Sequence, residues 1–290
     1  MSTLHPVFLT GKTPNLQFTS GSGDTIPPVK YSETKYEHTV TEVQMLDAGG
    51  TLAVFLACRR PGGNCAAAWR RENVLKGSNR FVLVTCEHGG NQVPHEWHYL
   101  FEDAEAILQS HRGWDKGALE LAKGIADTFN IKLITEETTR LLIDLNRSLH
   151  HRDLFSEFTG SCDIDTKHSI IDEIYLPYRN RIEAVIAAAI NQQQTVLHLS
   201  VHSFTPVLDK TTRHTDIGLL YDPDRKPEMK FCLELQNSIN KITDEWRVRR
   251  NYPYCGIADG LTTYLRKKHS DAEYCGIELE VNQAIISNKK

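Results

Sequence analysis

From Phe81 to the C-terminus, short apolar runs alternate with segments of helical periodicity. The runs have the length of strands and are rich in β-branched residues and leucine, at 81–86, 131–135, 141–145, 195–201, 216–221 and 274–281. Between them, apolar residues recur at intervals of three and four over 118–129, 171–186 and 231–242. This alternation predicts an α/β fold with a mostly parallel, mixed sheet flanked by helices. Ligands bind such sheets beyond the carboxyl ends of the strands, so polar residues there are the candidates for function.

The N-terminal part of the chain lacks this alternation. Residues 1–80 are rich in threonine, serine, glycine and proline and contain only weak apolar runs, such as 51–58. This composition predicts a poorly structured extension with one or two strands. The folded domain is therefore expected over 81–290.

Composition excludes several classes of partner. The net charge is −4 and no basic run resembles a nucleic-acid-binding stripe, so no nucleic-acid partner is expected. No segment reaches the roughly 20 apolar residues of a membrane span, and the first residues show no secretory signal. The seven cysteines are scattered without a CxxC pair, which favours reduced thiols and a cytoplasmic protein.

A histidine follows the first strand of the predicted domain. In CEHGGN, Gly89 and Gly90 are expected to leave room around His88 for a metal and a substrate. Neutral imidazole is the commonest side-chain metal ligand, and a turn with a hydrogen-bonded histidine is the alternative. Glu87 either hydrogen-bonds a ligand imidazole or caps the turn.

A second histidine, His202, closes the strand predicted over 195–201, so the two histidines can converge on one ion. His198 shares a face with His202 by alternation, but its mid-strand position favours a hydrogen-bonded core histidine. Asp115 precedes the helix predicted over 118–129. Alone it is expected to be a helix N-cap, and beside two ligand histidines it becomes a third ligand. His111 either orients a ligand or is only a loop residue.

Two acids, Glu278 and Glu280, are two residues apart on the last predicted strand and therefore point to one face. Buried carboxylates are costly without a partner. One of the two carboxylates would be buried because it acts as a general base beside a metal. The alternative is that both form salt bridges to arginine or lysine.

Positive charge flanks the run at 141–145. Arg140, Asn146 and Arg147 can hold an acidic substrate, because an arginine fork binds a carboxylate through two parallel hydrogen bonds. Structural pairing of arginine with Asp144 is the alternative.

The segment 251–260 has the proline and glycine spacing of a loop over the pocket. Within it, Tyr254 either reaches the substrate or packs as an aromatic side chain. Asp259 is expected to cap a helix that begins near Leu261.

Five motifs carry a family resemblance. The stretches EHGGNQVP, HRGWDKGALELA, TRLLIDLNRS, NYPYCGIADGLT and YCGIELEVNQ, in this order over about 81–286, closely resemble the N-formylglutamate amidohydrolase family. DLNR is also similar to the aspartoacylase and succinylglutamate desuccinylase group, and the whole arrangement is similar to zinc carboxypeptidases. The resemblance implies a zinc-exopeptidase (phosphorylase/hydrolase-like) sheet. It also implies a catalytic domain over 81–290 that hydrolyses the amide of an N-acylated acidic amino acid, most directly N-formyl-L-glutamate.

The resemblance also implies roles for the metal ligands. His88 and His202 match the family's histidine ligands of one Zn²⁺, although manganese or iron suits the same donors. Asp115 is assigned as the middle ligand by analogy with zinc amidases. The alternative is Asn91, which stands where related zinc hydrolases have a glutamate.

The catalytic and substrate-binding roles follow in the same way. Glu280 matches the general base, with Glu278 as its rival. Asn146 and Arg147 match the pair that holds a substrate carboxylate, and Arg140 either binds a second carboxylate or polarises the scissile carbonyl. Another N-acyl amino acid deacylase, a peptidoglycan-type amidase and a catalytically silent ligand-binding relative are the alternative functions.

Overall fold

The computed structural model describes the backbone of residues 42–47 and 52–57, and the backbone and side chains of 79–286. Strands β1 (Glu42–Asp47) and β2 (Leu52–Ala57) form an antiparallel hairpin. Most of the remaining extension predicted over 1–80 lies outside the described residues. The domain boundary at residue 80 therefore stays a prediction.

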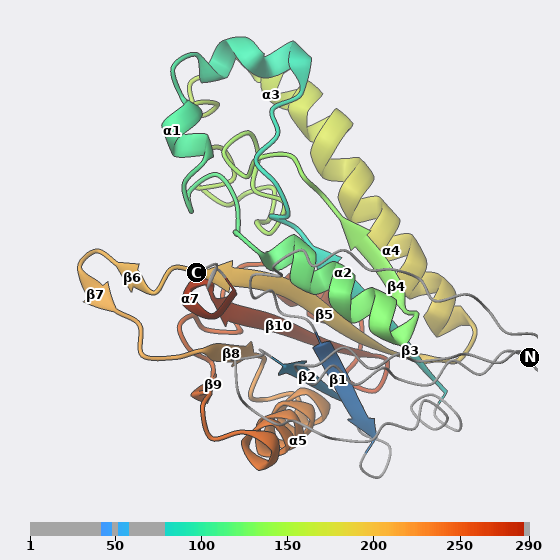
Figure 1. Cartoon of the computed structure of the whole chain (residues 1–290). Helices are drawn as coiled ribbons and strands as arrows, with labels where there is room; N and C mark the ends of the chain where they lie inside the picture. Colours follow the sequence, from blue (N-terminus) through green and yellow to red (C-terminus); the bar gives the residue numbers. More distant parts are fainter. Residues whose placement is uncertain (1–41, 48–51, 58–78, 287–290) are drawn as a thin grey trace, which may run out of the picture. The chain divides into compact units, whose positions relative to one another are not determined.

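A six-stranded mixed sheet lies at the centre of the described domain (Figure 1). Its strands stand in the order β4 (Lys132–Thr135), β3 (Arg80–Cys86), β5 (Thr195–Phe204), β10 (Tyr274–Asn282), β8 (Ile217–Leu220) and β9 (Val248–Arg250). The first four strands of this order are parallel to one another, and β8 pairs antiparallel with β10. The predicted α/β fold with a mostly parallel, mixed sheet is confirmed.

The helices flank this sheet. The longer ones are α2 (Ala118–Phe129), α4 (Leu176–Asn191), α5 (Lys226–Ile242) and α6 (Leu261–Lys268). A π-helical turn, η2 (Ile171–Tyr175), joins α3 (Ile164–Ile170) to α4, so the helical segment predicted over 171–186 begins earlier than expected. The short elements are η1 (His95–Phe101), α1 (Glu105–Leu108), the hairpin β6 (Val207–Leu208) and β7 (Thr211–Thr212), and α7 (Gln283–Ile286).

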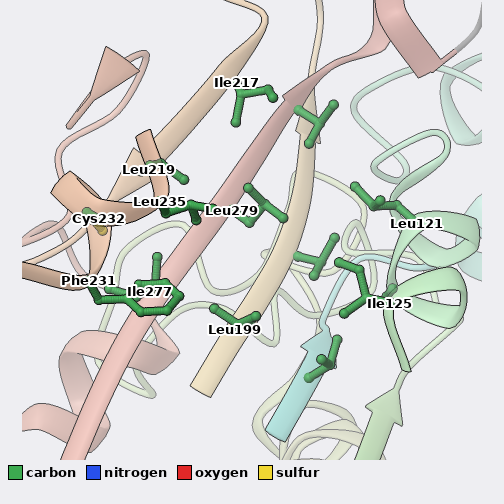
Figure 2. Packing of buried hydrophobic residues seen from close by; sticks show 14 of the residues in the cluster. Leu121, Ile125, Leu199, Ile217, Leu219, Phe231, Cys232, Leu235, Ile277 and Leu279 are labelled. Carbon is green, nitrogen blue, oxygen red and sulfur yellow. The ribbon is translucent and has the colours of Figure 1, made fainter. Parts of the chain in front are cut away.

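One face of the sheet is apolar along its whole length and is covered by α2 and α5. Figure 2 shows Leu121 and Ile125 of α2 on one side of this core and Leu235 of α5 on the other, with Leu199 of β5 and Ile277 of β10 in the same cluster. These side chains are almost completely buried, and each buried side chain of this size contributes about 1.5–3 kcal/mol to the free energy of unfolding. This face is structural.

The opposite face changes character along the strands. Near the amino ends it is apolar and packs with Ile182 and Ile186 of α4 and with Leu265 of α6. Toward the carboxyl ends it carries polar side chains, including Ser200 and His202 of β5, which are both buried. The polar end of this face is where the candidate site forms.

The strand predicted over 141–145 is wrong. The segment is buried, but it consists of turns and irregular chain and joins no strand of the described sheet; its residues are Leu141, Leu142, Ile143, Asp144 and Leu145. The backbone N–H of Asp144 donates to the Leu154 carbonyl at 2.9 Å. A segment buried on all sides has a continuous apolar sequence, whether it is a strand or an irregular segment. Periodicity alone therefore does not distinguish the two.

No helix among the described residues is long and apolar enough to cross a membrane.

Candidate metal centre and active site

Three buried side chains come together at the carboxyl edge of the sheet. His88 Nδ1 lies 3.3 Å from Asp115 Oδ2, and His202 Nδ1 lies 2.9 Å from the same oxygen. The centroids of the two imidazole rings are 5.1 Å apart. One ligand atom from each residue lies within 4.8 Å of the other two, which is close enough for one ion to bind all three. The three residues predicted as metal ligands are therefore neighbours. His88, Asp115 and His202 together are called the candidate metal-binding cluster.

Each imidazole holds its other ring nitrogen against a buried carboxylate. His88 Nε2 lies 2.8 Å from Asp144 Oδ1, and His202 Nε2 lies 3.2 Å from Glu87 Oε2. Metal-binding histidines almost always donate one ring N–H to such a group, which fixes the tautomer and leaves the other nitrogen for the metal. Of the two roles predicted for Glu87, the structure shows the hydrogen bond to an imidazole.

The charges around the centre favour a cation. Burial raises the pKa of Asp115, but His88, His202 and Arg140 outweigh this and hold that pKa below its usual range. Burial likewise opposes ionisation of Asp144, and Arg140 and His88 hold its pKa well below the usual value. Two imidazoles with an ionised carboxylate are a donor set that suits zinc and other divalent transition metals. The residues present therefore fit a metal ion.

The structure separates the alternatives for the third ligand. Helix α2 has Gly117 as its N-cap and no side-chain cap, so Asp115 is not the N-cap of that helix. The backbone N–H of Asp115 donates to the His88 carbonyl at 3.0 Å, which ties the two loops together. The side-chain amide of Asn91 instead donates to the Leu108 carbonyl at 3.0 Å, so Asn91 has a structural partner.

His198 is a hydrogen-bonded core residue. Its Nε2 lies 2.8 Å from the Thr85 hydroxyl, and its Nδ1 lies 2.7 Å from the Tyr274 hydroxyl. Burial lowers the pKa of His198 to about 4, so the ring is neutral at physiological pH. His111 has an exposed side chain and is not part of the metal-binding cluster.

The expectation for the two glycines after His88 is wrong. A Cβ on Gly89 would lie 2.9 Å from the Glu136 carbonyl oxygen, and one on Gly90 would lie 2.4 Å from the Glu137 carbonyl oxygen. The backbone N–H of Gly89 donates to that same Glu136 carbonyl at 3.0 Å. The glycines thus make room for the chain that follows β4 rather than for a metal or a substrate.

Of the two acids predicted on the last strand, Glu280 is the one that lies opposite a residue of the metal-binding cluster. It pairs with His202 across β10 and β5, and its Oε2 is buried with no hydrogen-bond partner among the described residues. Burial raises the pKa of Glu280 to about 7, His202 opposes this shift, and Asp115 adds to it. A carboxylate with a free oxygen and this pKa can exchange a proton near neutral pH.

Glu278 precedes Glu280 by two residues on the same face of β10, but its environment is different. Its Oε1 accepts a hydrogen bond from the Thr262 hydroxyl at 2.6 Å, and it pairs in register with Ser200 rather than with His202. A Cβ on Gly260 would lie 3.2 Å from this oxygen and 3.2 Å from Asn146 Oδ1, so both side chains approach the backbone of Gly260. This geometry favours Glu280 over Glu278 as a base.

Arg140 lies between two acids of the centre. Its Nη1 lies 3.3 Å from Asp115 Oδ1 and its Nη2 lies 2.9 Å from Asp144 Oδ2, while 27% of its side chain stays exposed. Structural pairing of an arginine with Asp144 was the alternative to substrate binding, and Arg140 forms this pair.

Asn146 and Arg147 connect this centre to α6. Asn146 Oδ1 accepts the Leu261 backbone N–H at 2.7 Å, which caps the helix. Arg147 Nη1 donates to the Asp259 carbonyl at 2.9 Å, and 32% of the arginine side chain is exposed. The predicted capping role of Asp259 is wrong, because its carboxylate instead accepts the backbone N–H and hydroxyl of Ser148 at 2.9 and 2.6 Å.

Two hydrogen-bonding residues of this centre were not identified from the sequence. Ser200 donates to Glu87 Oε2 at 2.5 Å, and Tyr178 donates to Glu87 Oε1 at 2.8 Å. Together they orient the carboxylate that holds His202. The alternation of the strand places Ser200 on the face of His202, but nothing in the sequence connects Tyr178 of α4 to β3.

Comparisons with known proteins identify the family of the chain. The family model for N-formylglutamate amidohydrolase matches residues 81–287. The crystal structure of a gene product from Agrobacterium tumefaciens has a TM-score of 0.61 and 26% sequence identity, over 73% of this chain and 84% of that one.

A second structure, of N-formylglutamate amidohydrolase from Ralstonia eutropha JMP134, has a TM-score of 0.47 and 15% identity, over 72% of this chain and 83% of that one. No curated protein matches the chain. The family match covers most of the chain, so the protein belongs to the N-formylglutamate amidohydrolase family.

Proposed function

We propose that this protein is a metal-dependent amidohydrolase that cleaves the amide of an N-acylated acidic amino acid. N-formyl-L-glutamate is the most direct substrate, with formate and glutamate as products. The observation that carries the proposal is Oε2 of Glu280, beside His202, which is buried and has no hydrogen-bond partner among residues 79–286, because a buried acid without a partner needs a reason. A general base in a hydrolytic site supplies that reason.

His88, Asp115 and His202 would hold the metal, with Asp144 and Glu87 orienting the two rings. A divalent ion at this position, most directly Zn²⁺, supplies Lewis acidity and makes a water nucleophilic near neutral pH. Three protein ligands are typical of catalytic rather than structural zinc sites.

Glu280 acts as general base and then as general acid. It takes a proton from the attacking water, whose oxygen forms the new bond to the acyl carbon. The same carboxyl group then gives a proton to the amine nitrogen as the carbon–nitrogen bond breaks. Burial, which raises the pKa of Glu280 in the metal-free protein, opposes the effect of a bound cation on this carboxyl group and so favours its proton uptake.

Asn146, Arg147 and Arg140 supply the polar groups for substrate binding. Arg147 is partly exposed and uses only one Nη atom in its hydrogen bond to Asp259, so the guanidinium can bind a substrate carboxylate. Nη1 of Arg140 lies 3.3 Å from Asp115 Oδ1, beside the candidate metal site, where its positive charge would stabilise the developing oxyanion.

The compartment is part of the proposal. The cysteines of the described part of the chain, Cys86, Cys162, Cys232, Cys255 and Cys275, are free thiols. Reduced thiols are typical of the cytoplasm, where we place the activity.

A substrate panel tests the activity. Zinc-loaded protein should hydrolyse N-formyl-L-glutamate with a higher kcat/KM than N-acetyl or N-succinyl glutamate, measured by release of the free amine. A preference for another acyl group would make it a different N-acyl amino acid deacylase. If the protein binds the metal but hydrolyses no member of the panel, it would be a catalytically silent relative of the family.

A further inference from the structure

Arg213 lies close to the candidate site, although no sequence motif predicts a functional role for it. Its guanidinium carbon is 5.7 Å from the Phe204 ring centroid and 5.0 Å from the Tyr254 ring centroid. Its Nη1 donates to the Tyr254 hydroxyl at 3.0 Å, and its backbone N–H donates to the Pro206 carbonyl at 2.8 Å. The side chain is therefore held in place from two directions.

The ring on one side of Arg213 belongs to the strand that carries a metal ligand. Phe204 is two residues beyond His202 on β5, so the two side chains lie on the same face, about 7 Å apart along the strand. Arg213 thus lies just past the carboxyl edge of the sheet, on the side of the metal-binding cluster.

The ring on the other side belongs to the loop that approaches Glu280. A Cβ on Gly218 would lie 2.2 Å from the Tyr252 carbonyl oxygen, 3.3 Å from Pro253 Cδ and 3.1 Å from Glu280 Cβ. Tyr254 follows directly in this loop, and burial together with the charge of Glu280 raises the pKa of its hydroxyl. The contact of Arg213 with Tyr254 therefore lies beside the candidate base.

Arg213 carries a charge without an acidic partner. Among residues 79–286, Arg140, Arg147 and Arg266 each have a carboxylate within ion-pair distance, whereas no such carboxylate lies within that distance of Arg213. Its only side-chain hydrogen bond within this range goes to a tyrosine hydroxyl, which leaves most of its five donors for a ligand.

We propose that Arg213, held by Phe204 and Tyr254, binds the second carboxylate of a dicarboxylic substrate and sets the preference for acidic N-acyl amino acids. This inference rests on the proposed function, in which Asn146 and Arg147 bind the first carboxylate. The Tyr254 hydroxyl and the two rings position the guanidinium, and a carboxylate ligand would form charge-assisted hydrogen bonds with its remaining donors.

Matched substrates test this role. The zinc-loaded wild type is compared with Arg213→Ala on N-formyl-L-glutamate and on the two monoamides that neutralise one carboxylate each. Arg213→Ala should lower kcat/KM for the diacid by about 10- to 100-fold, through KM, as expected for loss of a hydrogen bond between charged groups. One monoamide should be almost unaffected, and Arg213→Lys should recover part of the loss.

Arg249→Ala is the matched control. Arg249 lies 5.0 Å from the Tyr252 ring in the same region of the structure, so the variant also removes an arginine stacked on a tyrosine of the loop. It should leave the ratio of diacid to monoamide unchanged. Equal losses on all three substrates in Arg213→Ala, or no loss on any, would overturn the proposal while leaving the hydrolase function intact.

Calorimetry gives a readout that does not need turnover. Glutarate should bind the wild type more tightly than its monoamide does, and Arg213→Ala should remove this difference. If the wild type hydrolyses none of the substrates, the hydrolase function fails, and calorimetry still decides the role of Arg213. Equal affinity of the wild type and Arg213→Ala for glutarate would then contradict that role.

Discussion

Glu280 of β10 lies opposite His202 of β5 in the register of two parallel strands. A candidate base and a candidate metal ligand are therefore fixed on adjacent strands of the rigid sheet rather than on loops. Groups on strands keep their separation better than groups on loops, and acid–base catalysis depends on that separation. This pairing connects the fold to the proposed chemistry.

Glu280→Gln separates the base from the metal ligands. The variant should bind one zinc ion with wild-type affinity and lose about 10²- to 10⁴-fold in kcat, because only the proton transfer is removed. Metal content by mass spectrometry and the rate of amine release give the two readouts. Full activity in Glu280→Gln would move the base to another group, and Glu278→Gln is the control for the neighbouring acid.

The same variant should change how stability depends on pH in the metal-free protein. The pKa of Glu280 is raised from an ordinary 4.5 to about 7 by folding, so the folded state holds this proton where the unfolded state has released it. Stability contributed by this group is therefore present below pH 4.5 and lost as pH rises to about 7.

Glu280→Gln removes this loss. Relative to wild type, the chelator-treated variant should gain on the order of 3 kcal/mol in free energy of unfolding between pH 4.5 and pH 8. Urea denaturation at both pH values measures it. Wild-type and variant stabilities that change in parallel across this range would show that Glu280 titrates normally.

The carboxylates behind the two histidines should control metal affinity. Asp144→Asn and Glu87→Gln should each weaken zinc binding by about 10- to 100-fold, because the rings lose the groups that fix their tautomer. Competition with a chromogenic chelator measures the affinity. Glu183→Gln, which removes a carboxylate paired with Lys268 away from the metal-binding cluster, should leave zinc affinity unchanged. An equal loss in this control would assign the effect to general destabilisation.

Arg147→Ala should mainly raise KM for N-formyl-L-glutamate, since its guanidinium is proposed to bind a substrate carboxylate in the ground state and the transition state alike. Steady-state kinetics on this substrate and on its amidated analogues measure the effect. An equal rise in KM on analogues without carboxylates would rule out carboxylate recognition by Arg147.

Much of the fold could be predicted, because its signals are local. The run at 274–281 became β10, in which apolar residues alternate with Glu278 and Glu280. The run at 81–86 became β3, since apolar residues buried on both faces of a sheet leave a nearly continuous apolar pattern. The run at 141–145 has the same composition but is enclosed by loops and helices. Only tertiary packing distinguishes the two cases.

The site was predictable where one strand carries several groups. Alternation alone placed His202 with His198, and Glu278 with Glu280. Interactions between distant segments were not predictable, as with the helix cap that Asn146 supplies to Leu261 and the contact of Arg213 with Tyr254. The sequence holds no pairing rule for loops that meet only after folding.

Anomalous diffraction at the zinc edge, from crystals of zinc-loaded protein, tests the proposed metal site. We expect one strong peak within bonding distance of His88 Nδ1, His202 Nδ1 and an Asp115 oxygen, at about 2.0–2.2 Å from each. An active, zinc-containing crystal with no peak among these three residues would show that the metal site lies elsewhere.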